Sequence, residues 1–306
     1  MSPESTRSGI LVVDKGRGAT SFDVVAIARR RLGVRRIGHA GTLDPDATGV
    51  LPILVGEATK LAPYLVDQDK EYLATVRFGV TTDTHDVSGR VLSEAPVDDL
   101  TTARLEEACR AFVGRIKQVP PMYSAVHHQG RRLYELARAG IEVERAPREV
   151  TIERLELVLR AADRIDFRVA CSKGTYVRVL AADVGRALET RAHLERLRRT
   201  RVGAFRVEDA TAVDALLALA PAAALPVLAV REALAGYPAV AAPPDALERL
   251  RRGQQAPLAR LPAPRAAGET ALLLDPAGDV AAIIEAAGAR PAWRLVRLLR
   301  SRDTVS

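Results

Sequence analysis

Residues 37–60 read IGHAGTLDPDATGVLPILVGEATK, the most informative stretch of this 306-residue chain. Gly41 and Gly49 bracket a short segment that contains Pro45, so the backbone can turn tightly and is then stiffened by the proline ring. Such a rigid loop would present the Asp44 carboxylate at a fixed place. The same residues equally suit a turn in which Asp44 only caps backbone amides. Taken alone, the loop leaves both interpretations open.

A strand and a helix are predicted before this loop. Residues 10–14 form a short apolar run that ends in a turn, which is typical of a buried strand. Thr20 and Asp23 have the spacing of a capping box, and Gly33 can end a helix. We therefore predict a helix over residues 21–32.

Further elements follow the loop in an order typical of a mixed α+β protein. Residues 71–79 alternate between apolar and polar side chains, which predicts a half-buried strand. Residues 102–113 and 175–188 have helical spacing. Residues 150–159 and 165–171 predict two neighbouring strands.

Two segments do not fit a single compact core. A Pro-Pro break followed by a short basic helix, at about residues 118–149, would project from the body as a flap. Residues 236–306 resemble a small, mostly β appendage, with a hairpin turn at Asp-Pro-Ala-Gly. We expect a first domain over residues 1–235 and a second over 236–306.

The composition is that of an ordinary globular protein, with 48% hydrophobic and 27% charged residues. Cys109 and Cys171 form no Cys-x-x-Cys pair, which argues against structural zinc and against a disulfide framework. The first sixteen residues lack the pattern of a secretory signal, and the longest uncharged stretch is too short for a membrane span. We expect a cytoplasmic protein that does not associate with membranes.

The net charge of +7 is unevenly distributed. Residues 1–206 hold 34 basic and 27 acidic residues, whereas residues 207–306 hold 11 of each. Arginines cluster in RRRLGVRR (29–36) and in RAHLERLRRTRVGAFR (191–206), and both clusters would suit phosphates. A charge run by itself is more often typical of a solvated helix face. The clusters alone therefore do not establish a polyanionic partner.

Residues 39–49, HAGTLDPDATG, closely resemble the signature of the bacterial tRNA pseudouridine-55 synthases, the TruB family of pseudouridine synthases. Further blocks resemble this family in the same order between about residues 9 and 206, and a weaker likeness to its RNA-binding tail covers the end. The blocks are ILVVDKGRGATSFDVV, KEYLATVRFGVTTDTHDVSG, QVPPMYSAVHHQGRRLYELAR, CSKGTYVRVLAADVG and AHLERLRRTRVGAF. The resemblance implies the pseudouridine synthase fold, a mixed, largely antiparallel sheet with flanking helices, followed by a small β-rich PUA-like domain.

The resemblance also implies roles for individual residues. Asp44 matches the family's essential catalytic aspartate, Tyr72 the tyrosine on which the flipped uracil lies, and Arg178 the arginine that pairs with the aspartate. The substrate-binding residues that it implies are His39, which would fill space left by the extruded base, Tyr176 and Leu197 in the pocket wall, and Lys15. Gly16 departs from the family, where proline is usual, and this departure touches no catalytic position.

Physical chemistry supports these roles. A uridine in a structured arm must leave the stack before its glycosidic bond can be reworked. Tyr72 offers a stacking plane, although its apolar strand face also suits ordinary core packing. Arg178 would keep Asp44 ionised and aim it, through two parallel hydrogen bonds. Asp44 could then attack C1′ of the ribose, add to C6 of uracil or remove the C2′ proton, and Tyr72 is a candidate for the base that takes the C5 proton.

The expected activity is the isomerisation of uridine to pseudouridine at position 55 in the T loop of tRNA, without a metal or other cofactor. The expected partner is the T arm of tRNA, bound by a monomer with no obligate protein partner. One alternative is a tRNA-folding chaperone that uses the same cleft but does not need Asp44. Another is an enzyme that reaches a different RNA through a guide RNA, which the chain's own flap disfavours.

Overall fold

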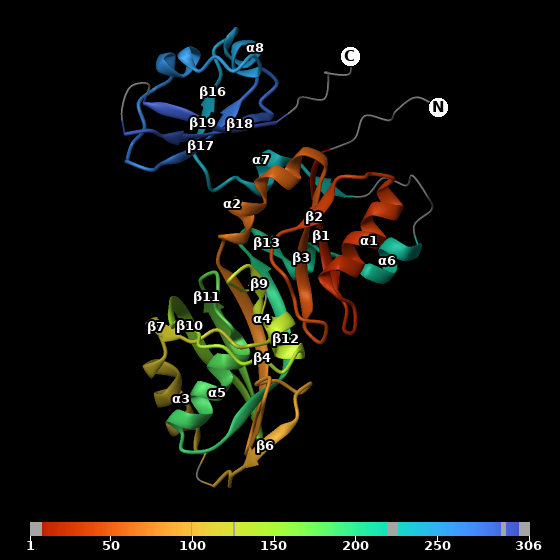
Figure 1. Ribbon diagram of the computed structural model, residues 1–306, viewed down its shortest axis with the longest axis vertical. Coiled ribbons are helices and arrows are strands. Elements are labelled where there is room, and N and C mark those ends of the chain that lie inside the picture. Colours follow the sequence, from red (N-terminus) through yellow and green to blue (C-terminus); the bar gives the residue numbers. More distant parts are fainter. Residues whose placement is uncertain (1–7, 99, 125, 219–225, 289–291, 300–306) are drawn as a thin grey trace.

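The computed structural model describes residues 8–98, 100–124, 126–218, 226–288 and 292–299. An 11-stranded mixed sheet forms the body, in the order β14-β1-β3-β12-β4-β11-β10-β7, with β2, β13 and β15 paired at its sides (Figure 1). Most neighbours are antiparallel, while β3 pairs with β12 and β1 with β14 in parallel. The strands are β1 (Gly9–Lys15), β2 (Ile37–His39), β3 (Thr48–Val55), β4 (Lys70–Phe78), β7 (Gly114–Gln118), β10 (Arg148–Ala161), β11 (Arg164–Cys171), β12 (Ala192–Val202), β13 (Phe205–Arg206), β14 (Thr211–Ala212) and β15 (Val227–Leu228).

Helices cover the two halves of this sheet. In the first half, α1 (Ser21–Leu32) packs beside α6 (Val213–Ala218). In the second half, α3 (Thr102–Ala111) and α5 (Val177–Ala187) lie against β10 and β12 (Figure 1). A 3-10 turn (Gly56–Leu61) leads into the short α2 (Ala62–Val66) after β3.

The local signals in the sequence produce these elements as predicted. The Thr20 hydroxyl accepts a hydrogen bond from the Asp23 amide at 3.1 Å, and the Thr20 amide donates to the Asp23 carboxylate at 2.8 Å, which completes the capping box. Gly33 ends α1 in the left-handed conformation, with φ of 65°. Strand β4 alternates between buried and half-buried residues, as the sequence predicts.

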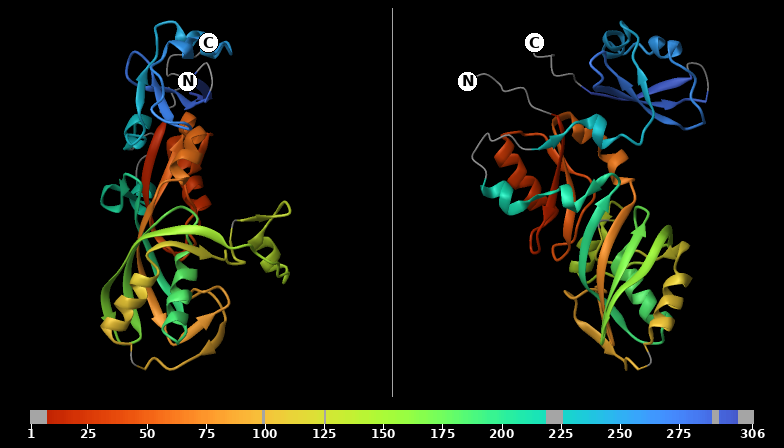
Figure 2. Two further views of the ribbon diagram at one scale, coloured as in Figure 1. Left: turned by 90° about the vertical axis from the view of Figure 1, so that its left-hand side faces the viewer. Right: turned by 180° about the vertical axis from the view of Figure 1, so that it is seen from behind.

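The predicted flap is confirmed. Its hairpin, β8 (His127–His128) and β9 (Arg131–Arg132), leads into α4 (Leu133–Arg138), and the unit projects from the body (Figure 2, left). Arg145 donates to the Pro120 carbonyl at 3.1 Å and so ties the base of the flap together. A second hairpin, β5 (Val80–Thr82) and β6 (Val91–Glu94), follows β4.

A separate four-stranded sheet follows the body, with the short helices α7 (Val230–Ala233) before it and α8 (Ala246–Arg251) within it. The predicted hairpin turn is present, because the Asp275 amide donates to the Asp279 carbonyl at 2.9 Å. The strands of this sheet are β16 (Ala239–Ala241), β17 (Thr270–Leu274), β18 (Val280–Ala286) and β19 (Trp293–Leu298).

This C-terminal sheet packs on the body and shares a hydrophobic cluster with it. Ile10 and Leu54 of the body lie in the same buried cluster as Leu272 and Ile283. Of the two predicted domains, residues 1–7, 99, 125, 219–225, 289–291 and 300–306 lie outside the described ranges. Within the described ranges, no helix is long and apolar enough to cross a membrane.

Candidate active site

A pocket of about 310 Å³ opens where the loop before β3 meets β4, β12 and the start of α5. Five of the residues singled out from the sequence line it together: Asp44, Tyr72, Tyr176, Arg178 and Leu197. These residues come from four segments that are far apart in the chain, and the sheet order brings them to one place. The other two, His39 and Lys15, lie outside the lining.

The loop that carries Asp44 is fixed from both ends. The Leu43 amide donates to the Ser21 hydroxyl at 2.9 Å, and that hydroxyl donates to the Leu43 carbonyl at 3.2 Å. Leu43 and Ala47 are buried in the main core. Asp44 lies between these anchors with 51% of its side chain exposed, so a rigid loop presents an accessible carboxylate.

Lys15 supports this loop from behind. Its ammonium is fully buried and donates to the carbonyls of Gly16, Ala19 and Pro45 at 3.0, 2.7 and 3.1 Å. Burial lowers the pKa of Lys15 to about 8, although the charges of Asp44 and Asp46 oppose the shift. Lys15 therefore stabilises the loop through hydrogen bonds and does not line the pocket in which a base would bind.

Arg178 connects the Asp44 loop to two other segments. Its Nη1 lies 3.5 Å from Asp44 Oδ2 and 3.1 Å from Asp86 Oδ2, while Nη2 donates to the Tyr123 carbonyl at the base of the flap. Only 7% of the side chain is exposed. The expected pair of parallel hydrogen bonds to Asp44 is therefore wrong, because the second arm of the guanidinium is used by the flap.

Asp86 is a site residue that the sequence did not indicate. Its carboxylate accepts from the Thr84 hydroxyl at 2.7 Å and the Ser88 amide at 3.0 Å, both within its own turn-rich loop. Burial would raise the pKa of Asp86, but these hydrogen bonds and the charge of Arg178 outweigh it and hold the pKa below its usual value. Asp86 therefore stays anionic and shares Arg178 with Asp44.

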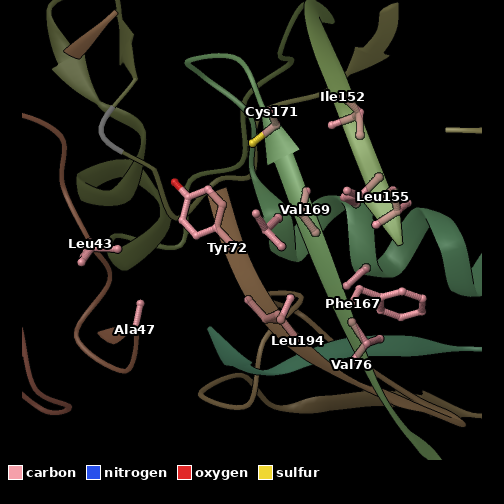
Figure 3. Packing of buried hydrophobic residues seen from close by; sticks show 14 of the residues in the cluster. Leu43, Ala47, Tyr72, Val76, Ile152, Leu155, Phe167, Val169, Cys171 and Leu194 are labelled. Atoms are coloured by element: carbon pink, nitrogen blue, oxygen red, sulfur yellow. The ribbon is translucent and has the colours of Figure 1, made fainter. Parts of the chain in front are cut away.

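Tyr72 is both packed and accessible to the pocket. It belongs to the main hydrophobic cluster, and Figure 3 shows its ring between Leu43 and Val169. Burial raises the pKa of Tyr72, and the neighbouring Arg199 guanidinium, which hydrogen-bonds the phenol, opposes this shift. The two interpretations of Tyr72, core packing and a surface for a base, are thus compatible.

Arg199 joins the Asp44 loop to the strand of Tyr72. It is 1% exposed, and it donates to the Val50 carbonyl at 2.7 Å and the Gly41 carbonyl at 2.9 Å. The sequence left open whether the arginine cluster around it meets phosphates, but Arg199 is buried in the interior and Arg198 pairs with Asp14 at 2.7 Å. Part of that cluster is therefore structural.

Gln118 positions the wall of the pocket. Its buried amide donates to the Tyr176 carbonyl at 3.1 Å and accepts from the Tyr176 amide at 2.8 Å. This pair of bonds fixes the residue before α5, and with it the Tyr176 ring, which lies 5.8 Å from the Arg178 guanidinium. No sequence signal marks Gln118, apart from its place just before the Pro-Pro break at Pro120.

His39 lies near the pocket but not on its lining. Its ring packs edge-on against Phe22, with 5.4 Å between centroids and an angle of 82°. Burial lowers the pKa of His39, and the charge of Arg199 adds to the shift. The lowered pKa favours a neutral imidazole, which lies beside Phe22, a residue that is exposed.

Known proteins are similar to this chain in sequence and in fold. A model of the TruB family pseudouridylate synthase (N terminal domain) matches residues 29–177, and one of the tRNA pseudouridylate synthase B C-terminal domain matches 178–225. The tRNA pseudouridine synthase B of Aromatoleum aromaticum is 52% identical over 229 residues, covering 75% of this chain and 74% of that protein. That of Gloeobacter violaceus is 47% identical, covering 81% and 86%.

Similarity to a solved structure extends over nearly the whole chain. A chain in the crystal structure of a Cbf5–Nop10–Gar1 complex superposes with a TM-score of 0.73 at 24% identity, covering 96% of this chain and 86% of that one. The fold and the sequence matches together define an isomerase with the pseudouridine synthase fold. The chain belongs to the TruB family of pseudouridylate synthases.

Proposed function

We propose that this chain converts uridine to pseudouridine at position 55 in the T loop of tRNA. The observation that carries the proposal is the convergence of Asp44, Arg178 and Tyr72 on one pocket, with 3.5 Å between Arg178 Nη1 and Asp44 Oδ2. Relatives named tRNA pseudouridine synthase B, at 52% and 47% identity, support tRNA as the substrate.

In the proposed reaction, the target uridine leaves the stack and its base enters the pocket. Unstacking costs a few kcal/mol, offset by new contacts in the pocket. The base lies on Tyr72, between the walls made by Tyr176 and Leu197. Arg178 then holds the Asp44 carboxylate toward the reacting ribose and base.

Asp44 has three possible first steps, and each balances without an external reactant. It can bond to C1′ while the C1′–N1 electron pair departs with uracil. It can take the C2′ proton, so that a C1′=C2′ bond forms as the base leaves. It can add to C6, so that the C5=C6 electron pair moves toward O4. In each case C5 then bonds to C1′, Asp44 is released from C1′ or C6 or returns its proton to C2′, and the C5 proton is lost while N1 gains a proton. Tyr72 is our candidate for the group that takes the C5 proton.

We further propose that the rest of the chain holds the tRNA. The flap would meet the T arm, and residues 236–306 would form a PUA-like RNA-binding domain beside a catalytic domain of residues 1–235. We expect a cytoplasmic monomer that needs no protein partner. The similar chain noted above comes from a complex with Nop10 and Gar1, so independence from partners is a point that the experiment must test.

The experiment is to incubate the purified chain alone with an unmodified tRNA transcript and to map pseudouridine at single-nucleotide resolution. A transcript with cytidine in place of the target uridine is the matched control. We expect one pseudouridine, at position 55, and none in the control. An unchanged transcript would refute the proposal, and faster tRNA refolding without modification would favour the chaperone.

A further inference from the structure

Lys70 is a buried cation on the pocket lining that no step above uses. It is the first residue of β4, two positions before Tyr72 and on the same face of the strand, and only 6% of it is exposed. Cys171 of β11 and Val202 of β12 lie opposite it in the sheet. It therefore sits at the end of the strand that carries the Tyr72 ring, inside the same pocket.

The ammonium of Lys70 is only partly satisfied by the protein. It donates to the carbonyls of Val66, the last residue of α2, and of Gln68, just beyond that helix. An ammonium has three hydrogens to donate. Among the described residues, no third acceptor lies within hydrogen-bond distance of Lys70 and no carboxylate lies within the 4.0 Å of an ion pair.

The charge around Lys70 makes this arrangement costly for the empty protein. Arg199, also buried, lies close enough to act on Lys70, and the pocket lining further includes Arg178 and Lys173. Asp44 is the sole carboxylate among the described lining residues. Asp67 and Asp69 act on Lys70 in the favourable sense, but neither forms a close ion pair with it among the described residues. A buried cation without a close ion-pair partner is unfavourable, and a negatively charged group in the pocket would offset that cost.

We propose that Lys70 is a further catalytic residue, whose ammonium donates to the uracil ring and stabilises the negative charge that forms there. The inference rests on the proposed function. All three first steps for Asp44 place an electron pair on the base, either as a departing uracil anion or as an enolate after addition to C6. Lys70 therefore assists the reaction whichever step occurs, as fixed donors stabilise a developing anion in a site that excludes water.

A purely structural role would give Lys70 a different signature. An ammonium near the end of α2 caps backbone carbonyls, and this contact stabilises the fold whether or not substrate is bound. A catalytic role appears instead in the rate at saturating tRNA. The two roles separate when rate, affinity and thermal stability are measured on the same variants.

The first experiment measures single-turnover pseudouridine formation by Lys70→Met, which keeps the length of the side chain and removes its charge. We expect the rate at saturating tRNA to fall about 100-fold, with tRNA affinity and melting temperature little changed. Lys70→Arg, which restores a charge, should recover much of the lost rate. Lys60→Met is the matched control, because Lys60 also donates to a backbone carbonyl, that of Leu298 at 2.6 Å, but lies outside the pocket.

A pH profile supplies an independent readout. Burial and the charge of Arg199 together lower the pKa of Lys70 to about 8, against the opposing effects of Cys171, Asp69 and Asp67. Lysine is charged below its pKa, so the stabilising charge is present at neutral pH and is lost as the pH rises past about 8. We expect kcat/KM of the wild type to fall there, and the fall to move to higher pH in Lys70→Arg.

The outcomes separate this inference from the proposed function. If the wild type forms no pseudouridine, the proposed function fails and the inference fails with it. If the wild type is active and Lys70→Met keeps its rate, or loses activity only in step with melting temperature or tRNA affinity, the inference alone is overturned. An unchanged pH profile in Lys70→Arg would also overturn it.

Discussion

Arg178 shows how one side chain can organise this site. Its Nη1 lies between the carboxylates of Asp44 and Asp86, and its Nη2 holds the Tyr123 carbonyl of the flap. The guanidinium keeps its charge when buried and offers donors in fixed directions. The position of the Asp44 carboxylate therefore depends on a planar group with several bonds, which a lysine ammonium cannot reproduce.

We predict that Arg178→Lys lowers the single-turnover rate about 100-fold, because a misplacement of about 1 Å can cost this much. Melting curves should show a loss of about 1–3 kcal/mol, from the hydrogen bonds to charged groups that lysine cannot make. Affinity for tRNA should change little.

Arg186→Lys is the control for this substitution. Arg186 is on the same helix, is 68% exposed and pairs with Asp183, so its replacement should have almost no effect. A wild-type rate in Arg178→Lys, or a loss explained wholly by unfolding, would contradict the role of Arg178.

The site residues that the sequence predicted are those carried by motifs, and the ones it missed are fixed by long-range contacts. Asp44, Tyr72 and Arg178 lie in recognisable blocks, and the structure brings them together. Gln118 forms hydrogen bonds with Tyr176, which is 58 residues away in the sequence. Arg199 donates to the Gly41 carbonyl across a separation of 158 residues. Such partners depend on the order and register of the strands, which no local pattern specifies.

The helices and strands themselves were largely predictable. Local signals specify both ends of helix α1: a capping box begins it at Thr20, and Gly33 ends it in the left-handed conformation. Strand β4 has a clean alternation. The parallel pairing of β3 with β12 was not predictable, because it joins strands 150 residues apart and lasts for only two residue pairs, Thr48 with Arg198 and Gly49 with Arg199.

Gly49 permits that close pairing of β3 and β12. It has φ of +105°, and a Cβ there would lie 2.1 Å from the Arg199 carbonyl oxygen. We predict that Gly49→Ala destabilises the protein by about 2–4 kcal/mol, because it adds backbone strain of about 1–3 kcal/mol to a clash between two backbones. Thermal or chemical unfolding measures the effect.

Gly38→Ala is the matched control, since its added Cβ would have its nearest neighbour 3.9 Å away. It should unfold close to the wild-type midpoint. Equal stability of the two variants would mean that β3 and β12 can separate at no cost, which contradicts the tight contact described here.

The whole molecule has a basic body that carries the pocket and the flap, with a C-terminal sheet packed against it. The net charge of +7 comes entirely from residues 1–206. Several arginines of this part form ion pairs within the protein, such as Arg36 with Glu57 at 2.8 Å and Arg198 with Asp14 at 2.7 Å. Arg29 and Arg30 at the end of α1 are exposed.

We predict that tRNA affinity falls steeply with salt, with log K against log salt sloping by about −0.7 to −0.9 for each phosphate neutralised. Replacing Arg29 and Arg30 by glutamine should make the slope shallower by that amount for each arginine that meets a phosphate. Arg36→Gln should change it less, because Glu57 already neutralises Arg36. Binding titrations at several salt concentrations give the slopes, and a flat wild-type response would mean that the basic surface does not meet the RNA.

The central claim is that this pocket isomerises uridine through the Asp44 carboxylate. The most direct test compares Asp44→Asn with the wild type on one unmodified tRNA under single-turnover conditions. The substitution removes the charge and keeps the size of a side chain that is 51% exposed, so folding and tRNA binding should persist. We predict rapid pseudouridine formation by the wild type and none by the variant, with equal tRNA affinities and melting temperatures. Measurable pseudouridine from a clean preparation of Asp44→Asn would contradict the assignment of Asp44 as the catalytic group.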